Sequence, residues 1–243
     1  SHTSNLATVS NCDSVIVTNV IMLPTYSITE AASICSGEDY TFPDGTIHVG
    51  ILTDESYTST FVTVGGCDSL IVTSITVNPL PIVDAGTSFS VCEDETAVLT
   101  ATNPNGAVIA WDNGVTNGVI FTPIATQTYS VTATDNNGCI STDDITITFN
   151  ENPDAAFSAD PTFGCAPLLV NFTNASTGSP VLCEWDFGDG QSAVGCGAIN
   201  HTYTISGQQT VTLTVTNAAG CGSTLIYTDY IDVYDQPIAD FSV

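Results

Sequence analysis

Apolar and polar side chains alternate along most of this 243-residue chain. Tyr129–Ala133 and Val211–Val215 place an apolar side chain at every second position, with Ser or Thr between. A third run of this kind opens at Tyr57. Successive side chains of an extended strand point to opposite faces, so a period of two indicates half-buried β-strands. No stretch has the apolar 3.6-residue period of a surface helix. The pattern predicts an all-β protein.

Tight reversals separate these runs. Asp-Gly and Asn-Gly pairs favour two-residue turns between antiparallel strands. They occur at Asp44-Gly45, Asn105-Gly106, Asn113-Gly114, Asn117-Gly118 and Asn137-Gly138. Short strands closed by such turns, in segments of 55 to 85 residues, predict immunoglobulin-like β-sandwiches.

One phrase recurs and divides the chain. This repeated pattern consists of an alternating run, a turn of small residues that ends in Cys, a second alternating run and a Pro. It occurs at Thr8–Pro24 and Thr63–Pro79, and looser copies occur at Val131–Pro153 and Thr214–Pro237. A repeat this long is a whole domain. We expect tandem sandwiches in a linear array, with the domains at 1–24 (the last strands of one repeat), 25–79, 80–152, 153–236 and 237–243 (the start of another).

The charge is extreme and of one sign. The chain has no Lys or Arg and 26 acidic residues, giving a formal net charge of −26. Phosphate recognition needs cationic side chains, so nucleic acid is excluded as a partner. Anionic lipid surfaces would repel the chain, and no apolar stretch is long enough to span a bilayer. An acidic surface that keeps a repetitive protein soluble is the simplest interpretation.

A divalent cation is the alternative role for these carboxylates. Calcium takes six to eight oxygen ligands from flexible loops. The candidate ligands are Glu93, Asp94, Asp143 and Asp144, and calcium is the one cofactor that we consider. No segment has the spacing of an EF-hand loop, and solvated turns explain the same residues. Zinc is disfavoured because no CxxC occurs.

The chain has nine cysteines, and they occupy similar positions in successive domains. Each complete domain has one Cys near its first strand and one at its last turn, which predicts the bridges Cys35–Cys67, Cys92–Cys139 and Cys165–Cys221. Cys183 and Cys196 remain and are paired with each other, although four cysteines in one domain allow three connectivities. The partner of Cys12 would lie upstream of Ser1. Regular bridges indicate an oxidising compartment outside the cytoplasm.

The segment at 153–236 resembles a polycystic kidney disease (PKD) domain. The resemblance rests on WDFGDG at Trp185–Gly190, HTY at His201–Tyr203, and the segment Phe157–Ser176. It implies a structural Trp185 in the core, Asp186 and Asp189 shaping a turn, and a hydrogen-bonded structural His201.

The segments at 25–79 and 80–152 resemble immunoglobulin-like repeats of very large Bacteroidota surface proteins. The resemblance rests on ICSGEDYTFPDGT in the first segment and on WDNGVTNGVIFTP and TYSVTATDNNGC in the second. It implies a surface filament or gliding-motility adhesin exported by type IX secretion. Trp111 and Trp185 are then expected to lie over the disulfides of their own domains.

This resemblance also suggests O-glycosylation. Ser14 and Ser69 fit the Asp-Ser/Thr-apolar acceptor pattern of that lineage. The competing interpretation is that Cys-Asp-Ser simply opens a strand after the turn.

No enzyme motif is present: GxSxG, HExxH and the P-loop are all absent, and the three His residues are far apart in sequence. We expect a non-enzymatic, extracellular stalk or filament segment at the cell surface. Its partners would be other copies of itself, neighbouring domains of the same chain, or a cell-surface or polysaccharide ligand. The alternative is a spacer or carbohydrate-binding region of a secreted hydrolase.

Overall fold

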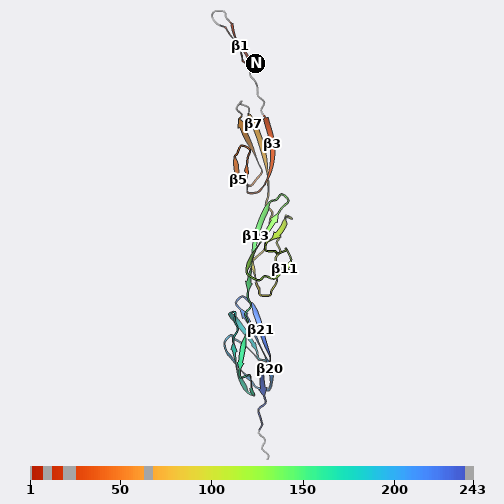
Figure 1. Cartoon of the computed structure of the whole chain (residues 1–243), viewed down its shortest axis with the longest axis vertical. Coiled ribbons are helices and arrows are strands. Elements are labelled where there is room, and N and C mark those ends of the chain that lie inside the picture. The colour runs from red at the N-terminus through yellow and green to blue at the C-terminus, as the bar shows by residue number, and fades with distance from the viewer. Residues whose placement is uncertain (1, 8–12, 19–25, 63–67, 239–243) are drawn as a thin grey trace, which may run out of the picture. The chain divides into compact units, whose positions relative to one another are not determined.

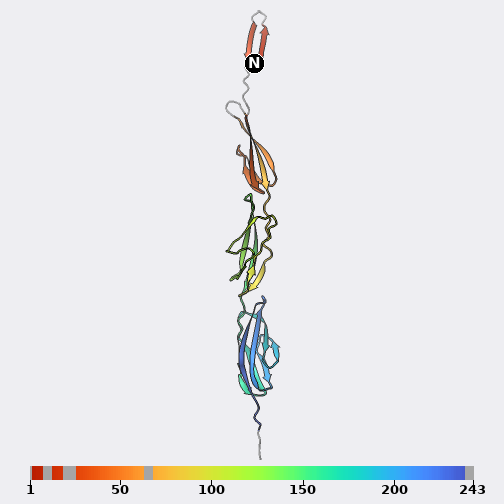
Figure 2. The ribbon, with the colours of Figure 1, turned by 90° about the vertical axis from the view of Figure 1, so that its right-hand side faces the viewer.

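The computed structural model describes residues 2–7, 13–18, 26–62 and 68–238. In these residues every regular element is a β-strand, so the expected all-β fold class is confirmed. No helix in this part of the chain could cross a bilayer. Figures 1 and 2 show strands that are neighbours in sequence gathered into the same sheets.

The chain divides into two compact units. Unit 1 holds residues 1–82, 105–108 and 133–141, and unit 2 holds 83–104, 109–132 and 142–243. Three groups of strands lie at 26–78, 89–150 and 157–234. We call them the small, middle and C-terminal sandwiches. A hairpin of β1 (His2–Ala7) and β2 (Asp13–Thr18) precedes them.

The small sandwich pairs a three-stranded sheet, in the order β3-β7-β6, with the hairpin β4-β5. Its strands are β3 (Tyr26–Cys35), β4 (Glu38–Thr41), β5 (Ile47–Ile51), β6 (Glu55–Val62) and β7 (Asp68–Asn78). β7 runs parallel to β3 and antiparallel to β6. Its core of buried apolar side chains consists of Phe42, Ile51 and Ile75.

Two hydroxyl groups are buried beside this small core. Ser59 and Thr73 are both 0% exposed, and neither hydroxyl has a hydrogen-bond partner. A buried polar group without a partner costs free energy, because it has lost its bonds to water. The small sandwich therefore combines little apolar burial with an internal polar cost.

The middle sandwich has a four-stranded sheet, in the order β10-β12-β13-β8, and the short pair β11-β9. Its strands are β8 (Phe89–Cys92), β9 (Ala97–Val98), β10 (Val108–Trp111), β11 (Ile120–Phe121), β12 (Gln127–Thr134) and β13 (Ile140–Asn150). Tyr129, Val131 and Ala133 are buried at alternate positions of β12, as the sequence pattern predicts.

The C-terminal sandwich has a five-stranded sheet, in the order β15-β21-β20-β17-β18, and a three-stranded sheet, in the order β14-β16-β19. Its strands are β14 (Phe157–Asp160), β15 (Phe163–Cys165), β16 (Leu168–Asn174), β17 (Pro180–Asp186), β18 (Ser192–Val194), β19 (Ile199–Tyr203), β20 (Gly207–Asn217) and β21 (Gly222–Tyr234).

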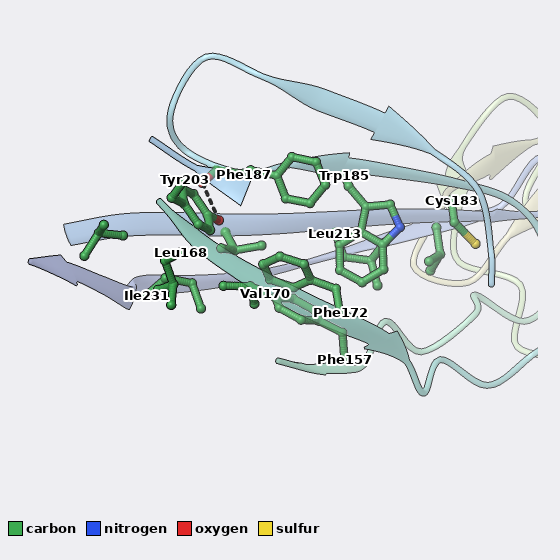
Figure 3. Close-up of a cluster of buried hydrophobic side chains, with 13 residues drawn as sticks. Phe157, Leu168, Val170, Phe172, Cys183, Trp185, Phe187, Tyr203, Leu213 and Ile231 are labelled. Carbon is green, nitrogen blue, oxygen red and sulfur yellow. Dashed lines mark hydrogen bonds between the residues drawn. The ribbon is translucent and has the colours of Figure 1, made fainter. Parts of the chain in front are cut away.

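Alternate side chains of β16, β17 and β20 fill this last core. Leu168, Val170 and Phe172 point inward from β16 toward Trp185 and Leu213. Figure 3 shows these rings and branched side chains packed together, with the Tyr203 hydroxyl donating to the Phe187 carbonyl at 3.0 Å. The C-terminal sandwich has thirteen buried residues in one cluster, so local packing alone stabilises it well.

Candidate functional site: the interdomain disulfides

The last strand of each sandwich has a cysteine position at each of its ends. β13 begins directly after Cys139, and its final residue, Asn150, pairs with Cys92 of the parallel strand β8. Eleven extended residues span about 35 Å. Two cysteines can form a disulfide only when their Cα atoms lie within about 7 Å. Cys92 and Cys139 of the same sandwich therefore cannot reach each other.

The other two sandwiches repeat this arrangement. In the C-terminal sandwich β21 begins directly after Cys221, and its last residue, Tyr234, pairs with Cys165. In the small sandwich the last residue of β7, Asn78, pairs with Cys35. We call Cys35, Cys92 and Cys165 the first-strand cysteines, and Cys139 and Cys221 the turn cysteines.

The bridges join the first-strand cysteine of one sandwich to the turn cysteine of the next. Cys35 is bonded to Cys139 and Cys92 to Cys221, each with a Cα–Cα distance of 5.5 Å. The predicted pairs Cys92–Cys139 and Cys165–Cys221 are therefore wrong. So is Cys35–Cys67, because Cys35 is already bonded; Cys67, like Cys12, lies outside the described residues. The prediction placed the cysteines in the right elements but ignored the length of the strand between them.

The two bonded first-strand cysteines are held by the same local hydrogen-bond geometry. The residue after each cysteine donates its N–H to the last carbonyl of the neighbouring strand, Ser36 to Asn78 at 2.8 Å and Glu93 to Asn150 at 2.9 Å. Each cysteine N–H donates to the carboxylate three residues ahead. The acceptors are Glu38 at 2.8 Å and Glu95 at 2.7 Å. This C-x-x-E spacing is a sequence signal that we missed.

The turn cysteines also share one geometry. The N–H of Cys139 donates to the Asp135 carboxylate at 2.8 Å, and that of Cys221 donates to the Asn217 amide oxygen at 3.1 Å. In return the backbone N–H of Asp135 or Asn217 donates to the carbonyl of its cysteine. Both turn cysteines are at most 1% exposed. These hydrogen bonds thus fix the position of the cysteine that bonds to the first-strand cysteine of the preceding sandwich.

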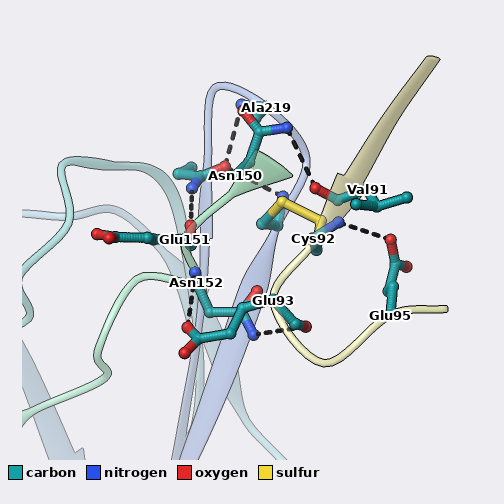
Figure 4. Close-up of a disulfide and its surroundings, with 10 residues drawn as sticks. Val91, Cys92, Glu93, Glu95, Asn150, Glu151, Asn152 and Ala219 are labelled. Atoms are coloured by element: carbon teal, nitrogen blue, oxygen red, sulfur yellow. Dashed lines mark hydrogen bonds between the residues drawn. A yellow bond between two sulfur atoms is a disulfide. The ribbon is translucent and has the colours of Figure 1, made fainter. Parts of the chain in front are cut away.

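Hydrogen bonds surround the bridge between Cys92 and Cys221, as Figure 4 shows. The Asn217 side chain donates to the Glu151 carbonyl at 3.0 Å, and the Asn150 side chain donates to the Val91 carbonyl at 3.4 Å. The Asn152 N–H donates to the Glu93 carboxylate at 3.3 Å. The connection at 151–153 is therefore fixed to both the first-strand loop and the turn of the following sandwich.

The fourth predicted bridge is present inside the C-terminal sandwich. Cys183 is bonded to Cys196, with Cα atoms 5.0 Å apart, and the Asn174 side chain donates to the Cys196 carbonyl at 3.1 Å. Cys165 is free and exposed. Neither tryptophan lies over a Cys92–Cys139 or Cys165–Cys221 bridge, because those bridges do not form. Trp185 instead packs in the same cluster as Cys183.

The calcium candidates bond to the protein itself. Asp143 accepts the Ala85 N–H at 2.8 Å, Asp144 accepts the Ser130 hydroxyl, and Glu93 accepts from Asn152. Asp94 occupies a turn with φ of 65°. Within the described ranges, no three His, Cys, Asp or Glu residues gather closely enough to hold a metal.

The expected roles of the PKD-like residues are confirmed. Asp186 and Asp189 accept the N–H groups of Gly188 and Gln191 and so close the turn. His201 is 8% exposed, contacts Asp189 at 2.8 Å and stacks on Phe187. These groups are structural supports.

Four ionisable groups among the described residues have a shifted pKa: Asp44, Tyr129, Tyr203 and Tyr234. Burial, with smaller contributions from the nearby charges of Asp189 and Asp186, raises the pKa of Tyr203 well above its usual value. The pKa of the exposed Asp44 is lowered, chiefly by the hydrogen bond from the Thr46 backbone.

The glycosylation sites remain predictions. Ser14 lies in β2 and Ser69 in β7, where Ser69 pairs with Tyr26 and Phe61. Both positions follow the start of a strand, as the competing interpretation of Cys-Asp-Ser also requires.

Residues 150–233 match the family described as PKD domain. The first PKD domain of the Vibrio cholerae metalloprotease PrtV is 34% identical over 33% of this chain and 98% of its own, with a TM-score of 0.29. A protein from a study of carbohydrate-binding modules of the β-sandwich superfamily is 28% identical over 35% of this chain and 36% of its own, with a TM-score of 0.33.

The Down syndrome cell adhesion molecule, in a structure of its eight N-terminal immunoglobulin domains, is 14% identical over 85% of this chain and 36% of its own, with a TM-score of 0.48. No curated protein matches the chain. Residues 150–233 thus form a PKD domain, and two further β-sandwiches precede it in the chain. A PKD domain together with the three disulfides of the described residues is typical of an extracellular protein.

Proposed function

We propose that this chain is a mechanical segment of an extracellular stalk or filament at the cell surface, in which disulfides join successive sandwiches. The observation that supports it best is the pairing of Cys35 with Cys139 and of Cys92 with Cys221. A bridge within one domain protects only that domain. A bridge from one domain to the next makes separation of the two domains depend on breaking a covalent bond.

The two interdomain bridges overlap along the sequence. One closes 104 residues and the other 129, and the segment between Cys92 and Cys139 lies inside both. By the chain-entropy model each stabilises the folded state by nearly 5 kcal/mol, against roughly 3 kcal/mol for the 13-residue Cys183–Cys196 loop. The overlap couples all three sandwiches to one another.

The proposal extends to location and partners. A net charge of −26 disfavours lateral association of bare chains, so the nearest partners are neighbouring domains of the same chain. Adhesion to a cell-surface or polysaccharide ligand would then reside in other parts of the assembly. A non-enzymatic role, a Bacteroidota source, type IX export and gliding motility belong to the same proposal and rest on sequence resemblance.

The alternative is a spacer or carbohydrate-binding region of a secreted hydrolase. A carbohydrate-binding face needs exposed aromatic platforms. Trp111 is 9% exposed and Trp185 is 1% exposed, so both indole rings serve the cores. The two tryptophans therefore offer no such platform, and the pairing of Cys35 with Cys139 and of Cys92 with Cys221 favours the stalk.

Single-molecule pulling tests the mechanical role. With handles at Tyr26 and Tyr234, the shortest covalent path of the oxidised chain runs through Tyr26–Cys35, Cys92–Cys139 and Cys221–Tyr234. Full extension should then reach roughly 250 Å, whereas the reduced chain should reach roughly 750 Å. An oxidised chain that extends as far as the reduced one would exclude a mechanical role for the bridges.

A double variant, Cys35→Ser with Cys139→Ser, sharpens this experiment. The Cys92–Cys221 bridge still bypasses most of the chain, so the extension should rise only to roughly 290 Å. If bridges formed within domains, the same variant would break two of them, and the extension would reach roughly 550 Å. The two lengths are easily resolved.

A further inference from the structure

Cys165 occupies the position that Cys35 and Cys92 occupy in the other two sandwiches. Each of the three ends a strand that runs parallel to the last strand of its sandwich, and each pairs with that strand's final residue. The residue after Cys165, Ala166, donates its N–H to the Tyr234 carbonyl at 2.9 Å. The same bond follows Cys35 and Cys92, so the three sites have one backbone geometry.

The side chain three residues after Cys165 differs from that at the other two sites. Leu168 stands three residues ahead, where the other two sites have Glu38 and Glu95. Leu168 is buried in the core of its own sandwich. The carboxylate contact is therefore absent at Cys165, while the strand pairing and the following N–H bond are kept.

Cys165 is also the first-strand cysteine that nothing covers. Cys35 and Cys92 are partly buried and bonded, whereas Cys165 is exposed and free. Two large apolar side chains lie beside it: Phe163, in the same strand, is 65% exposed, and Tyr234, its pairing partner, is 48% exposed. An exposed thiol with exposed aromatic neighbours is typical of a surface that another domain covers.

We propose that Cys165 forms a disulfide with the turn cysteine of the sandwich domain that follows in the same chain. In both observed bridges the partner is the turn cysteine of the next sandwich along the sequence. Gln236-Pro237, after β21, repeats the step Asn152-Pro153 that leads from the middle sandwich into the C-terminal one. The partner of Cys165 is thus the cysteine at the end of a hairpin turn. Hydrogen bonds would stabilise that turn as they stabilise Asp135–Cys139 and Asn217–Cys221.

The bond requires an oxidant. The two thiols lose two protons and two electrons in total, and one S–S bond forms between them. A thiol–disulfide oxidoreductase of the export compartment accepts the electrons, and its own disulfide is reduced to two thiols. This inference goes beyond the proposed mechanical role, because it assigns a partner to a residue that is free in the structure.

Alkylation of the secreted full-length chain in denaturant before reduction, followed by peptic digestion at acidic pH, tests the assignment. Acid keeps thiols protonated and suppresses exchange. Fewer than about one in ten copies of Cys165 should be alkylated, and its peptide should be joined to one from a later domain, at a cysteine that directly precedes a strand. A Cys165 that is mostly alkylated, or joined to Cys165 or to a turn cysteine of a second copy, overturns the proposal.

Two variants keep the test decisive. Cys165→Ser should make one later turn cysteine newly open to alkylation, while Cys35–Cys139 and Cys92–Cys221 stay intact. Cys196→Ser, the matched control, should expose Cys183 alone. If Cys165→Ser exposes no later cysteine, the assignment fails. That failure would leave the pulling experiment unaffected, because pulling reads only the bridges already present.

Discussion

The small and C-terminal sandwiches both pair a strand that ends in Cys in parallel with their last strand, but they differ in what stabilises them. Among the described residues, the core of the small sandwich has three buried apolar side chains, whereas that of the C-terminal sandwich has thirteen buried residues and its own disulfide. Residues 63–67, between β6 and β7, lie outside the described residues. We therefore expect the interdomain bridges to contribute most to folding stability where the local core is smallest.

The largest expected effect is loss of the Cys35–Cys139 bridge. Cys35→Ser with Cys139→Ser should destabilise the small sandwich by nearly 5 kcal/mol in the chain-entropy model. With so small a core, amide hydrogen exchange in β6 and β7 should accelerate by orders of magnitude. As control, Cys183→Ser with Cys196→Ser should leave exchange in these strands unchanged. Equal protection in both variants would remove the contrast between the sandwiches.

The C-terminal sandwich should instead be sensitive to local packing. At Gly188, with φ of 84°, an added Cβ would lie 2.5 Å from the Thr210 carbonyl oxygen. We expect Gly188→Ala to cost about 2–3 kcal/mol, from backbone strain and the clash together. Gly190→Ala is the matched control, because its φ is 85° but its Cβ would meet nothing. Urea unfolding followed by tryptophan fluorescence should show the smaller loss for Gly190→Ala.

A third effect depends on pH. Burial, more than the charges of Asp189 and Asp186, raises the pKa of Tyr203 in the folded state. The unfolded chain then releases this proton from about pH 10, while the folded chain keeps it. Stability is full below that pH and should fall above it by up to about 1.4 kcal/mol per pH unit.

The variant Tyr203→Phe isolates this effect. It removes the hydrogen bond to the Phe187 carbonyl, so it should be less stable than the parent at neutral pH. Its unfolding midpoint should depend less on pH above 10. Cys165 should be alkylated in both proteins to prevent disulfide exchange. Parallel curves for the two proteins would contradict the assignment.

The smallest effect should be a gain. Thr73→Val removes a buried hydroxyl that has no partner and keeps the shape of the side chain. We expect the small sandwich to gain about 1 kcal/mol, seen as slower hydrogen exchange in β7. Thr60→Val, at an exposed position of β6, should change the exchange little. A loss of stability in Thr73→Val would show that this hydroxyl has a partner in solution.

Much of the fold could be predicted because a strand has a local sequence signal, the alternation of apolar and polar side chains. Alternation in Tyr129–Ala133 and in Val211–Val215 marks buried faces that the structure confirms. The WDFGDG turn and His201 also follow from local sequence, because their hydrogen bonds span few residues or adjacent strands.

The disulfides could not be predicted in the same way, because their partners are set by which end of a sandwich each cysteine occupies. Cys92 and Cys139 are closer in sequence than Cys92 and Cys221, yet an 11-residue strand separates the first pair. Strand direction carries that information, and the parallel pairing of β8 with β13 is a tertiary feature. The sequence did contain one usable signal, the length of the last alternating run of each domain. That run is too long for cysteines at its two ends to form a disulfide.

A disulfide map of the oxidised 243-residue chain tests the central claim most directly. The chain has no Lys or Arg, so trypsin cannot cleave it, and pepsin at acidic pH is the suitable protease. The account predicts bridged peptides that contain Cys35 with Cys139 and Cys92 with Cys221. Bridged peptides that contain Cys92 with Cys139 and Cys165 with Cys221 would contradict it.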